Sequence, residues 1–222
     1  MKDEREVIEI FENFGEKFLE EEKVNKKAKN VRKLIVKLLL PVKNKRILDA
    51  GCGIGLVSKN FLKFNPKEIY CLDISKKMIE TAKREIRSKK VKFFVDDMEK
   101  VKFPDNFFDI IVCNFSLHFK RKIRTTFKNF YRMVKQKGKI LIAIPHPYRR
   151  TAKYSKNYFK FKKVWIIDKR MKRFFYTWKV EDYINIPIKI GFKLKEIREV
   201  ESEKIGKVIY PLYLILLFEK WF

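Results

Sequence analysis

The sequence predicts an α/β fold built on a doubly wound, mostly parallel sheet. Between residues 45 and 144, short apolar stretches alternate with stretches of helical periodicity. Such alternation places a parallel sheet between helices on both faces, and right-handed crossovers make it doubly wound. The chain has 222 residues, of which 46% are hydrophobic, enough for one sizeable core. We therefore expect 1–222 to form a single domain.

Two helices are expected before the first strand. The first covers residues 4–22, and the second covers about 26–40 and ends at Pro41. Apolar residues recur at helical spacing in the first helix, at Val7, Ile8, Phe11, Phe14, Phe18 and Leu19. Acidic residues lie between them, so this helix is amphipathic.

Seven strands are expected along the rest of the chain, each of them short and mostly apolar. They cover 46–50, 68–72, 91–95, 108–113, 139–144, 192–199 and about 211–220. The helices between them are expected at about 55–63, 75–87, 120–134 and 179–190. Gly138 is expected to turn the chain into the fifth strand, and Gly191 to end the last helix. The regular pattern breaks after Pro145, so an insertion is expected over 145–178.

A glycine-rich turn links the first strand to the helix that follows it. It reads Gly51-Cys52-Gly53-Ile54-Gly55, and Asp73 stands at the end of the next strand. Ligands of open α/β sheets bind beyond the carboxyl ends of the strands, where a carboxylate can accept both ribose hydroxyls. The spacing fits neither the dinucleotide fingerprint nor the P-loop. It favours a nucleoside cofactor that is cationic at its reactive end.

Four ordered motifs carry a family resemblance. They are ILDAGCGIG at 47–55, LDISKKMIETAK at 72–83, VDDMEKVKFPDNFFDIIVCNFSLHF at 95–119 and KGKILIAIPHP at 137–147. With these motifs the chain resembles the class I S-adenosylmethionine-dependent methyltransferases, above all the small-molecule branch of the ubiquinone, menaquinone and biotin pathways. The resemblance implies a Rossmann-like sheet of seven strands with an antiparallel last strand, and S-adenosylmethionine as cofactor.

The resemblance also implies a role for particular residues at the cofactor. Gly51, Gly53 and Gly55 would line its methionine end, and Asp49 would support that loop and the amino group. Asp73 would bind the ribose. The adenine and the sulfonium region would be contacted by Ile74, Met78, Asp96, Asp97, Met98 and Asn114. Whether Asp96 or Asp97 makes the side-chain contact to adenine stays open.

The resemblance divides the chain into segments with separate tasks. Residues 1–40 would cover the cofactor, and 41–144 would form the cofactor-binding core. The insertion 145–178 would cover the acceptor, and 179–222 would close the sheet. In the insertion, aromatic residues would wall the acceptor pocket: Tyr148, Tyr154, Tyr158, Trp165, Tyr176 and Trp178. Packing of these rings against the sheet is the alternative.

The chain has two histidines, and both follow predicted strands at the edge where ligands bind. His118 follows the fourth strand and His146 the fifth. A hydroxyl acceptor needs a general base, for which histidine is suited near neutral pH. Both are therefore candidate catalytic residues, and hydrogen-bonded loop histidines are the alternative.

The net charge of +27 leaves the acceptor class open. Residues 149–179 hold twelve basic residues and one acidic residue, interleaved with nine aromatic residues. Such a stretch can bind the phosphates and bases of RNA, or an anionic membrane surface. However, Lys outnumbers Arg 41 to 13 across the chain, which favours a generally lysine-rich composition as the origin of the charge. A small-molecule methyltransferase, an RNA methyltransferase and a non-catalytic scaffold remain as hypotheses.

The cysteines and the lengths of the apolar stretches bear on the cellular compartment and on membrane association. Three cysteines without a CxxC pair predict neither a disulfide framework nor a metal site, and they fit a reducing cytoplasm. No stretch is long and apolar enough for a membrane span. The oligomeric state cannot be predicted from these features.

Overall fold

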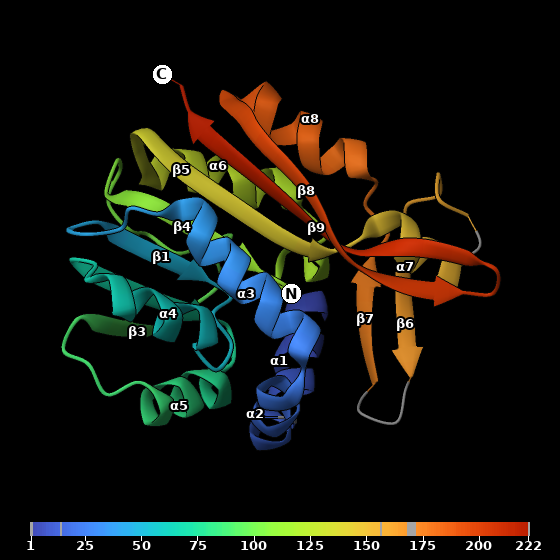
Figure 1. The fold of residues 1–222 in the computed structure, drawn as a ribbon, viewed down its shortest axis with the longest axis horizontal. Helices are drawn as coiled ribbons and strands as arrows, with labels where there is room; N and C mark the ends of the chain where they lie inside the picture. Colours follow the sequence, from blue (N-terminus) through green and yellow to red (C-terminus); the bar gives the residue numbers. More distant parts are fainter. Residues whose placement is uncertain (1, 14, 156, 168–171, 222) are drawn as a thin grey trace.

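The computed structural model describes residues 2–13, 15–155, 157–167 and 172–221. Its centre is a sheet with the strand order β3-β2-β1-β4-β5-β9-β8 (Figure 1). The strands of this sheet are β1 (Arg46–Ala50), β2 (Glu68–Asp73), β3 (Val91–Val95), β4 (Phe108–Asn114), β5 (Val134–Pro145), β8 (Phe192–Ile205) and β9 (Val208–Lys220). Strands β1 to β5 pair in parallel, whereas β9 is antiparallel to both β5 and β8. The predicted fold class is therefore confirmed.

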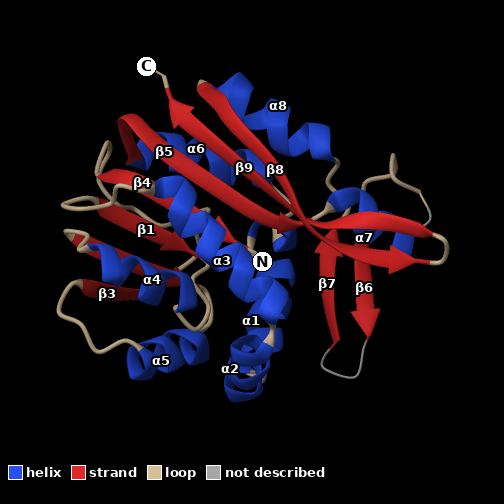
Figure 2. Cartoon of the chain, viewed as in Figure 1, coloured by secondary structure: helices blue, strands red, loops and turns tan. Residues whose placement is uncertain are grey.

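Helices cover both faces of the sheet (Figure 2). They are α1 (Lys2–Glu12), α2 (Gly15–Val24), α3 (Lys26–Leu39), α4 (Leu56–Phe61), α5 (Lys76–Glu85), α6 (Ile123–Met133), α7 (Pro147–Tyr154) and α8 (Val180–Ile190). Alternate residues of each strand point to opposite faces. Leu48 accordingly packs in one core with Phe127 of α6, and Ile47 packs in the other core with Ile35 of α3.

The strand order reverses next to β1. From β1 the chain moves outward through β2 and β3, and it then crosses to β4 on the other side of β1. A crevice forms at such a switch point, outside the carboxyl ends of the strands. The glycine turn after β1 and Asn114 at the end of β4 both lie at this place.

The N-terminal segment differs from the prediction. The single helix expected over 4–22 is wrong, because the chain forms α1 and α2 there. The amide of Asn13 donates to the carbonyl of Glu9 at the end of α1, and α2 begins at Gly15, a poor helix former. The predicted apolar position Phe14 and the side chain of Phe18 lie outside what the structure describes.

Two further differences lie after α6. Strand β5 begins at Val134, directly after the helix, so the prediction that Gly138 starts the strand is wrong. Gly138 instead lies in an irregular part of β5, between the residues that pair with Phe108 and Ile110. Within the expected insertion, α7 and a separate two-stranded sheet of β6 (Lys163–Ile167) and β7 (Lys172–Tyr176) form, which the sequence did not predict. None of the helices in the described ranges could cross a bilayer.

Candidate cofactor and acceptor site

A cavity of about 540 Å³ opens at the carboxyl ends of β1, β2 and β4. Its volume is typical of a site for a drug-sized ligand. Its wall includes most of the predicted cofactor residues, namely Gly51, Gly53, Asp73, Ile74, Met78, Asp96, Asp97, Met98 and Asn114. The structure thus brings together residues from four segments of the chain, those that follow β1, β2 and β3 and the end of β4.

The glycine turn is held close to the end of β2. The amides of Gly51 and Cys52 donate to the carbonyl of Leu72 at 2.7 and 2.9 Å. Gly51 has a φ of +72°, and a Cβ atom built on it would lie 2.4 Å from the Cβ and Oγ of Ser116. A side chain at this position is excluded both by the backbone and by space. Bare backbone therefore forms this part of the cavity wall.

Asp73 joins the glycine turn to α5. Its carboxylate accepts from the amide of Gly53 at 2.8 Å and from the amide of Ser75 at 3.0 Å. Burial raises the pKa of Asp73, while these amide donors lower it. Since a carboxylate can accept several hydrogen bonds, Asp73 retains acceptor capacity for hydroxyl groups of a ligand in the cavity.

Asp49 and Gly55 support the site from behind, because neither is among the described residues of the cavity wall. Asp49 is buried and accepts from Ser58 Oγ at 2.7 Å, and burial raises its pKa to about 7. Gly55 has a φ of +78° and begins α4, next to Ile86. The structure therefore does not show Gly55 lining the methionine end of a cofactor.

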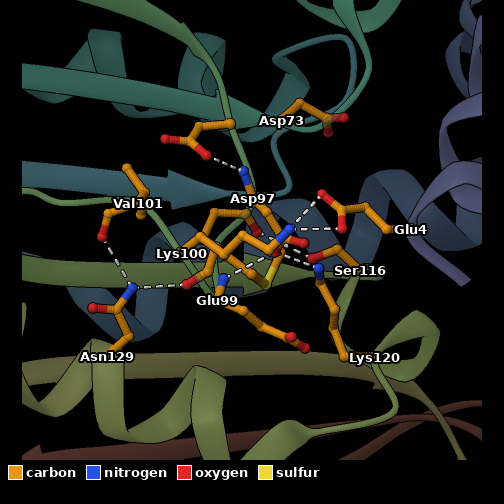
Figure 3. Close-up of polar contacts among 12 residues, drawn as sticks. Glu4, Asp73, Asp97, Glu99, Lys100, Val101, Ser116, Lys120 and Asn129 are labelled. Atoms are coloured by element: carbon orange, nitrogen blue, oxygen red, sulfur yellow. Dashed lines mark hydrogen bonds and ion pairs between the residues drawn. The ribbon is translucent and has the colours of Figure 1, made fainter. Parts of the chain in front are cut away.

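Asp97 is held by contacts within the protein (Figure 3). Asp96, in contrast, is exposed. Asp97 forms an ion pair with Lys120 and accepts from the amide of Glu99 at 2.9 Å. Asp96 Oδ1 accepts from the amide of Asp97 at 2.6 Å. Since Asp97 is already paired, Asp96 is the better placed of the two for a ligand contact.

Apolar side chains and one unpaired amide complete this end of the cavity. Met78 and Met98 are buried, and Ile74 is half-buried beside them. Asn114 Oδ1 is buried without a hydrogen-bond partner in the described part of the chain. An unpaired buried acceptor is costly, and a donor on a bound ligand would remove that cost.

His118 lies on the cavity wall, in the short helical turn Leu117–Phe119 after β4. Burial lowers the pKa of His118 well below its usual value, and the charges of Arg150 and Arg173 lower it further. Its imidazole is therefore neutral at pH 7. Nδ1 has no hydrogen-bond partner among the residues described and remains able to accept a proton.

His146 does not share this position. It precedes α7, is buried, and is not among the described residues of the cavity wall. Its Nε2 lies 2.8 Å from Glu199 Oε1 on β8. The structure thus gives His146 a contact between β8 and α7, in place of the predicted contact with substrate.

None of the six predicted pocket aromatics lies on the wall of this cavity within the described ranges. Tyr148 is 51% exposed and packs on Tyr158 and Tyr210. Trp165 is 41% exposed and packs against Phe174. Tyr176 stacks on Phe161, and Trp178 Nε1 donates to the carbonyl of Lys120 at 2.8 Å. These contacts pack the rings against one another and against neighbouring segments.

Other residues form the second end of the cavity. Val7 and Phe11 reach it from α1, Phe119 from the turn after β4, and Arg149, Arg150 and Arg173 from α7 and β7. None of them was predicted from the sequence as a site residue. One signal was present: four of the 13 arginines of this lysine-rich chain fall within residues 149–173, and the three on the cavity wall are among them.

The wall fits a nucleoside with a cationic centre. The bare backbone at Gly51, the carboxylate of Asp73 and the unpaired amide oxygen of Asn114 suit an amino-acid end and a ribose. The apolar surface of Met78 suits an adenine. S-Adenosylmethionine has all of these parts, and it supplies an electrophilic methyl group on sulfur when bound.

Comparison with known proteins agrees with this geometry. Residues 48–142 match the family model described as "Methyltransferase domain". Malonyl-[acyl-carrier protein] O-methyltransferase 2 of Coxiella burnetii is 28% identical over 120 residues, which are 51% of this chain and 48% of that protein. Demethylmenaquinone methyltransferase of Thermotoga maritima is 34% identical over 112 residues, 50% of this chain and 48% of that protein. The chain thus matches about half the length of these curated relatives.

A solved structure extends the likeness of fold to most of the chain. A Listeria monocytogenes protein, described as a candidate S-adenosylmethionine dependent methyltransferase, superposes with a TM-score of 0.74. It is 20% identical, and the match covers 86% of this chain and 99% of that one. Residues 48–142 thus carry a methyltransferase domain, and the shared fold and the glycine turn with its acidic partner support a class I S-adenosylmethionine-dependent methyltransferase.

Proposed function

We propose that this chain transfers a methyl group from S-adenosylmethionine to a small-molecule acceptor by in-line displacement. The observation that carries this proposal is that one cavity joins two chemically different ends. One end carries the glycine turn and Asp73, and the other carries Phe119, His118 and arginines from α7 and β7. A cofactor at the first end and an acceptor at the second would meet inside a single cavity.

The chain's contribution to such a reaction is mainly positioning and exclusion of water. Methyl transfer from a sulfonium has a neutral leaving group, so alignment of the reactants matters more than acid catalysis. We propose that neutral His118, whose Nδ1 has no hydrogen-bond partner among the residues described, accepts the proton of an acceptor hydroxyl. An acceptor that is already an anion would need no such base.

The contacts of α1 support the proposal that the N-terminal helices cover the cavity. Glu12 Oε1 accepts from Ser75 Oγ at 2.9 Å and from the amide of Lys77 at 3.1 Å, which holds the end of α1 on α5. Phe11 packs edge-on against Phe119 at 5.5 Å. We propose that residues 1–40 exclude water from the bound cofactor and that 145–178 cover the acceptor. The buried thiols Cys71 and Cys113 also support a reducing, cytoplasmic location.

The names of the relatives also support a small acceptor. One is a malonyl-[acyl-carrier protein] O-methyltransferase, and another is a demethylmenaquinone methyltransferase. Part of the charge in the basic stretch is moreover used inside this chain. Lys163 pairs with Asp3 and Glu6 of α1, and Arg149 pairs with Glu203.

An RNA acceptor is the second candidate, favoured by exposed rings on the insertion. Phe159 is 82% exposed, and Trp165, which is 41% exposed, lies under the ammonium groups of Lys163 and Lys172. Rings with adjacent cations suit stacking of single-stranded bases. If RNA is the acceptor, log K for RNA binding falls steeply with log salt concentration.

A transfer assay separates the two candidates. The purified chain is incubated with methyl-labelled S-adenosylmethionine and with either the small-molecule fraction or the RNA fraction of a cell extract. We expect label in the small-molecule fraction. When the chain is heat-denatured before the incubation, we expect no label in either fraction. Label in RNA alone would favour the second candidate. A folded chain that binds the cofactor and labels neither fraction would contradict the proposal.

A further inference from the structure

Three arginines lie on the acceptor side of the cavity. Arg149 and Arg150 come from α7, and Arg173 comes from β7. They share the cavity with Asp73, which lies at the end of β2 and accepts from the glycine turn. The cavity wall therefore carries acidic groups from the strand ends and guanidinium groups from the insertion.

Arg150 is buried without a carboxylate partner in any interaction that the structure describes for it. The residue is 8% exposed, and its guanidinium lies 4.5 Å from the ring centre of Phe175. Its Nε and Nη1 atoms are buried and have no hydrogen-bond partner in the described ranges. A buried cation with unsatisfied donors is costly unless a ligand completes it.

The neighbouring charges increase that cost. Burial lowers the pKa of Arg150 to about 9, and the charges of Arg173 and Arg149 contribute, yet the group stays protonated at neutral pH. Glu203 is engaged by Arg149 and also by Lys153. Arg149 Nε is itself buried without a hydrogen-bond partner in the part of the chain described. Among Arg149, Arg150, Lys153 and Glu203, positive charge therefore exceeds negative charge.

We propose that the acceptor carries a compact anionic oxygen group, a carboxylate or a phosphate, and that Arg150 binds it together with Arg149. This inference rests on the proposed function and narrows its substrate class. A planar guanidinium offers two parallel donors to two oxygens of such a group. The bound anion would satisfy the orphaned donors and neutralise the repulsion among the three arginines. Arg150 thereby determines specificity, separating anionic acceptors from neutral ones of the same shape.

Packing of Arg150 on Phe175 is a structural role that the test must separate from anion binding. Arg150→Met keeps an unbranched apolar side chain over the ring and removes the charge. Arg150→Lys keeps the charge and loses the paired donors. Arg124→Gln is the matched control, because Arg124 is an exposed cation on α6.

The experiment titrates two anions and a neutral analogue into the full chain, with and without saturating S-adenosylhomocysteine. The probes are malonate, inorganic phosphate and malonamide, at constant ionic strength, with calorimetry and thermal unfolding as readouts. We expect the wild type and Arg124→Gln to bind malonate or phosphate, and neither to bind malonamide. Arg150→Met should bind the anion at least about tenfold more weakly, with partial rescue in Arg150→Lys. Without anion, Arg150→Met should melt at the same temperature as the wild type or higher.

The outcomes distinguish a carboxylate from a phosphate on the acceptor. They also distinguish a failure of the anion-binding inference from a failure of the proposed methyltransferase function. Binding of malonate alone identifies a carboxylate, and binding of phosphate alone identifies a phosphate-bearing acceptor. The inference is overturned if the wild type binds S-adenosylhomocysteine but neither anion, or if Arg150→Met binds anions as well as the wild type. An equal loss in Arg124→Gln would also overturn it, because binding would then follow net charge. Failure to bind S-adenosylhomocysteine would instead contradict the proposed function, and the titrations without it still test Arg150.

Discussion

The burial of Asp49 predicts how the free energy of unfolding of this chain changes with pH. The side chain lies at the end of β1, is 1% exposed, and accepts one hydrogen bond from Ser58 Oγ. Its Oδ1 has no hydrogen-bond partner in the portion of the chain described. Burial is the main cause that raises its pKa from 3.8 to about 7, and the charge of Asp73 contributes. The folded chain therefore holds a proton on Asp49 that the unfolded chain releases.

The sign of the effect on stability follows from this difference in proton binding. Between pH 3.8 and about 7 the folded state binds one proton more at this residue than the unfolded state. Each pH unit in that window therefore lowers the free energy of unfolding by about 1.4 kcal/mol. Over the whole window the loss is about 4 kcal/mol, and above it the contribution of Asp49 is constant.

Asp49→Asn removes this titration and leaves an amide oxygen that can accept from Ser58. Any fixed cost of burying the amide is the same at every pH, so it cancels when pH values are compared. Urea unfolding of the wild type and the variant at pH 5, 6, 7 and 8 measures the difference directly. From pH 5 to pH 7 the difference should move by about 2 kcal/mol in favour of the variant, because Asp49 is half-titrated at pH 7.

Asp105→Asn serves as the control, because the Asp105 side chain is 67% exposed and pairs with Arg132 at the surface. Its stability difference from the wild type should stay nearly constant over the same range. If the difference between Asp49→Asn and the wild type is also constant from pH 5 to pH 7, Asp49 is ionised in the folded chain. The account of its burial would then be wrong.

Three further predictions concern the cavity. Asp73→Ala should weaken binding of S-adenosylhomocysteine at least about tenfold in calorimetry, through loss of charged hydrogen bonds, whereas Asp105→Asn should not; unchanged affinity would remove Asp73 from the cofactor site. The ring proton resonances of His118 should show no titration between pH 6 and 8 in NMR spectra, because burial lowers its pKa; a midpoint in that range would contradict a neutral imidazole. Gly51→Ala should cost at least about 2 kcal/mol of unfolding free energy, because of backbone strain and steric overlap. Gly206→Ala, at φ +60° with no atom within 4 Å of the added Cβ, should cost about 1 kcal/mol, and equal losses would contradict the overlap.

The cofactor side of the site could be predicted because its residues follow consecutive strands. In a parallel sheet the residues after each strand meet at one edge, so Gly51, Asp73 and Asn114 are brought together by the fold class alone. Asp49 shows the limit of that reasoning. Its position in the motif gives its place in the chain, whereas its contact with Ser58 depends on how α4 packs on the sheet.

The acceptor side could not be predicted in the same way. Its wall depends on contacts between segments far apart in the sequence, such as Phe11 with Phe119 and Lys163 with Asp3. The aromatic stretch drew attention to Trp165, but strand alternation in β6 leaves that ring partly exposed, while Val164 and Ile166 are buried. The arginines on the wall were hidden in a general excess of basic residues, although arginine is the rarer cation in this chain.

Binding of S-adenosylmethionine to the purified, folded chain tests the central claim most directly. Calorimetry should show saturable binding of one S-adenosylmethionine per chain, with S-adenosylhomocysteine competing for the same site. ATP should not compete, because the glycine turn lacks the sequence of a phosphate-binding loop. A chain that unfolds cooperatively, and so is folded, but binds neither nucleoside at millimolar concentration would contradict the account.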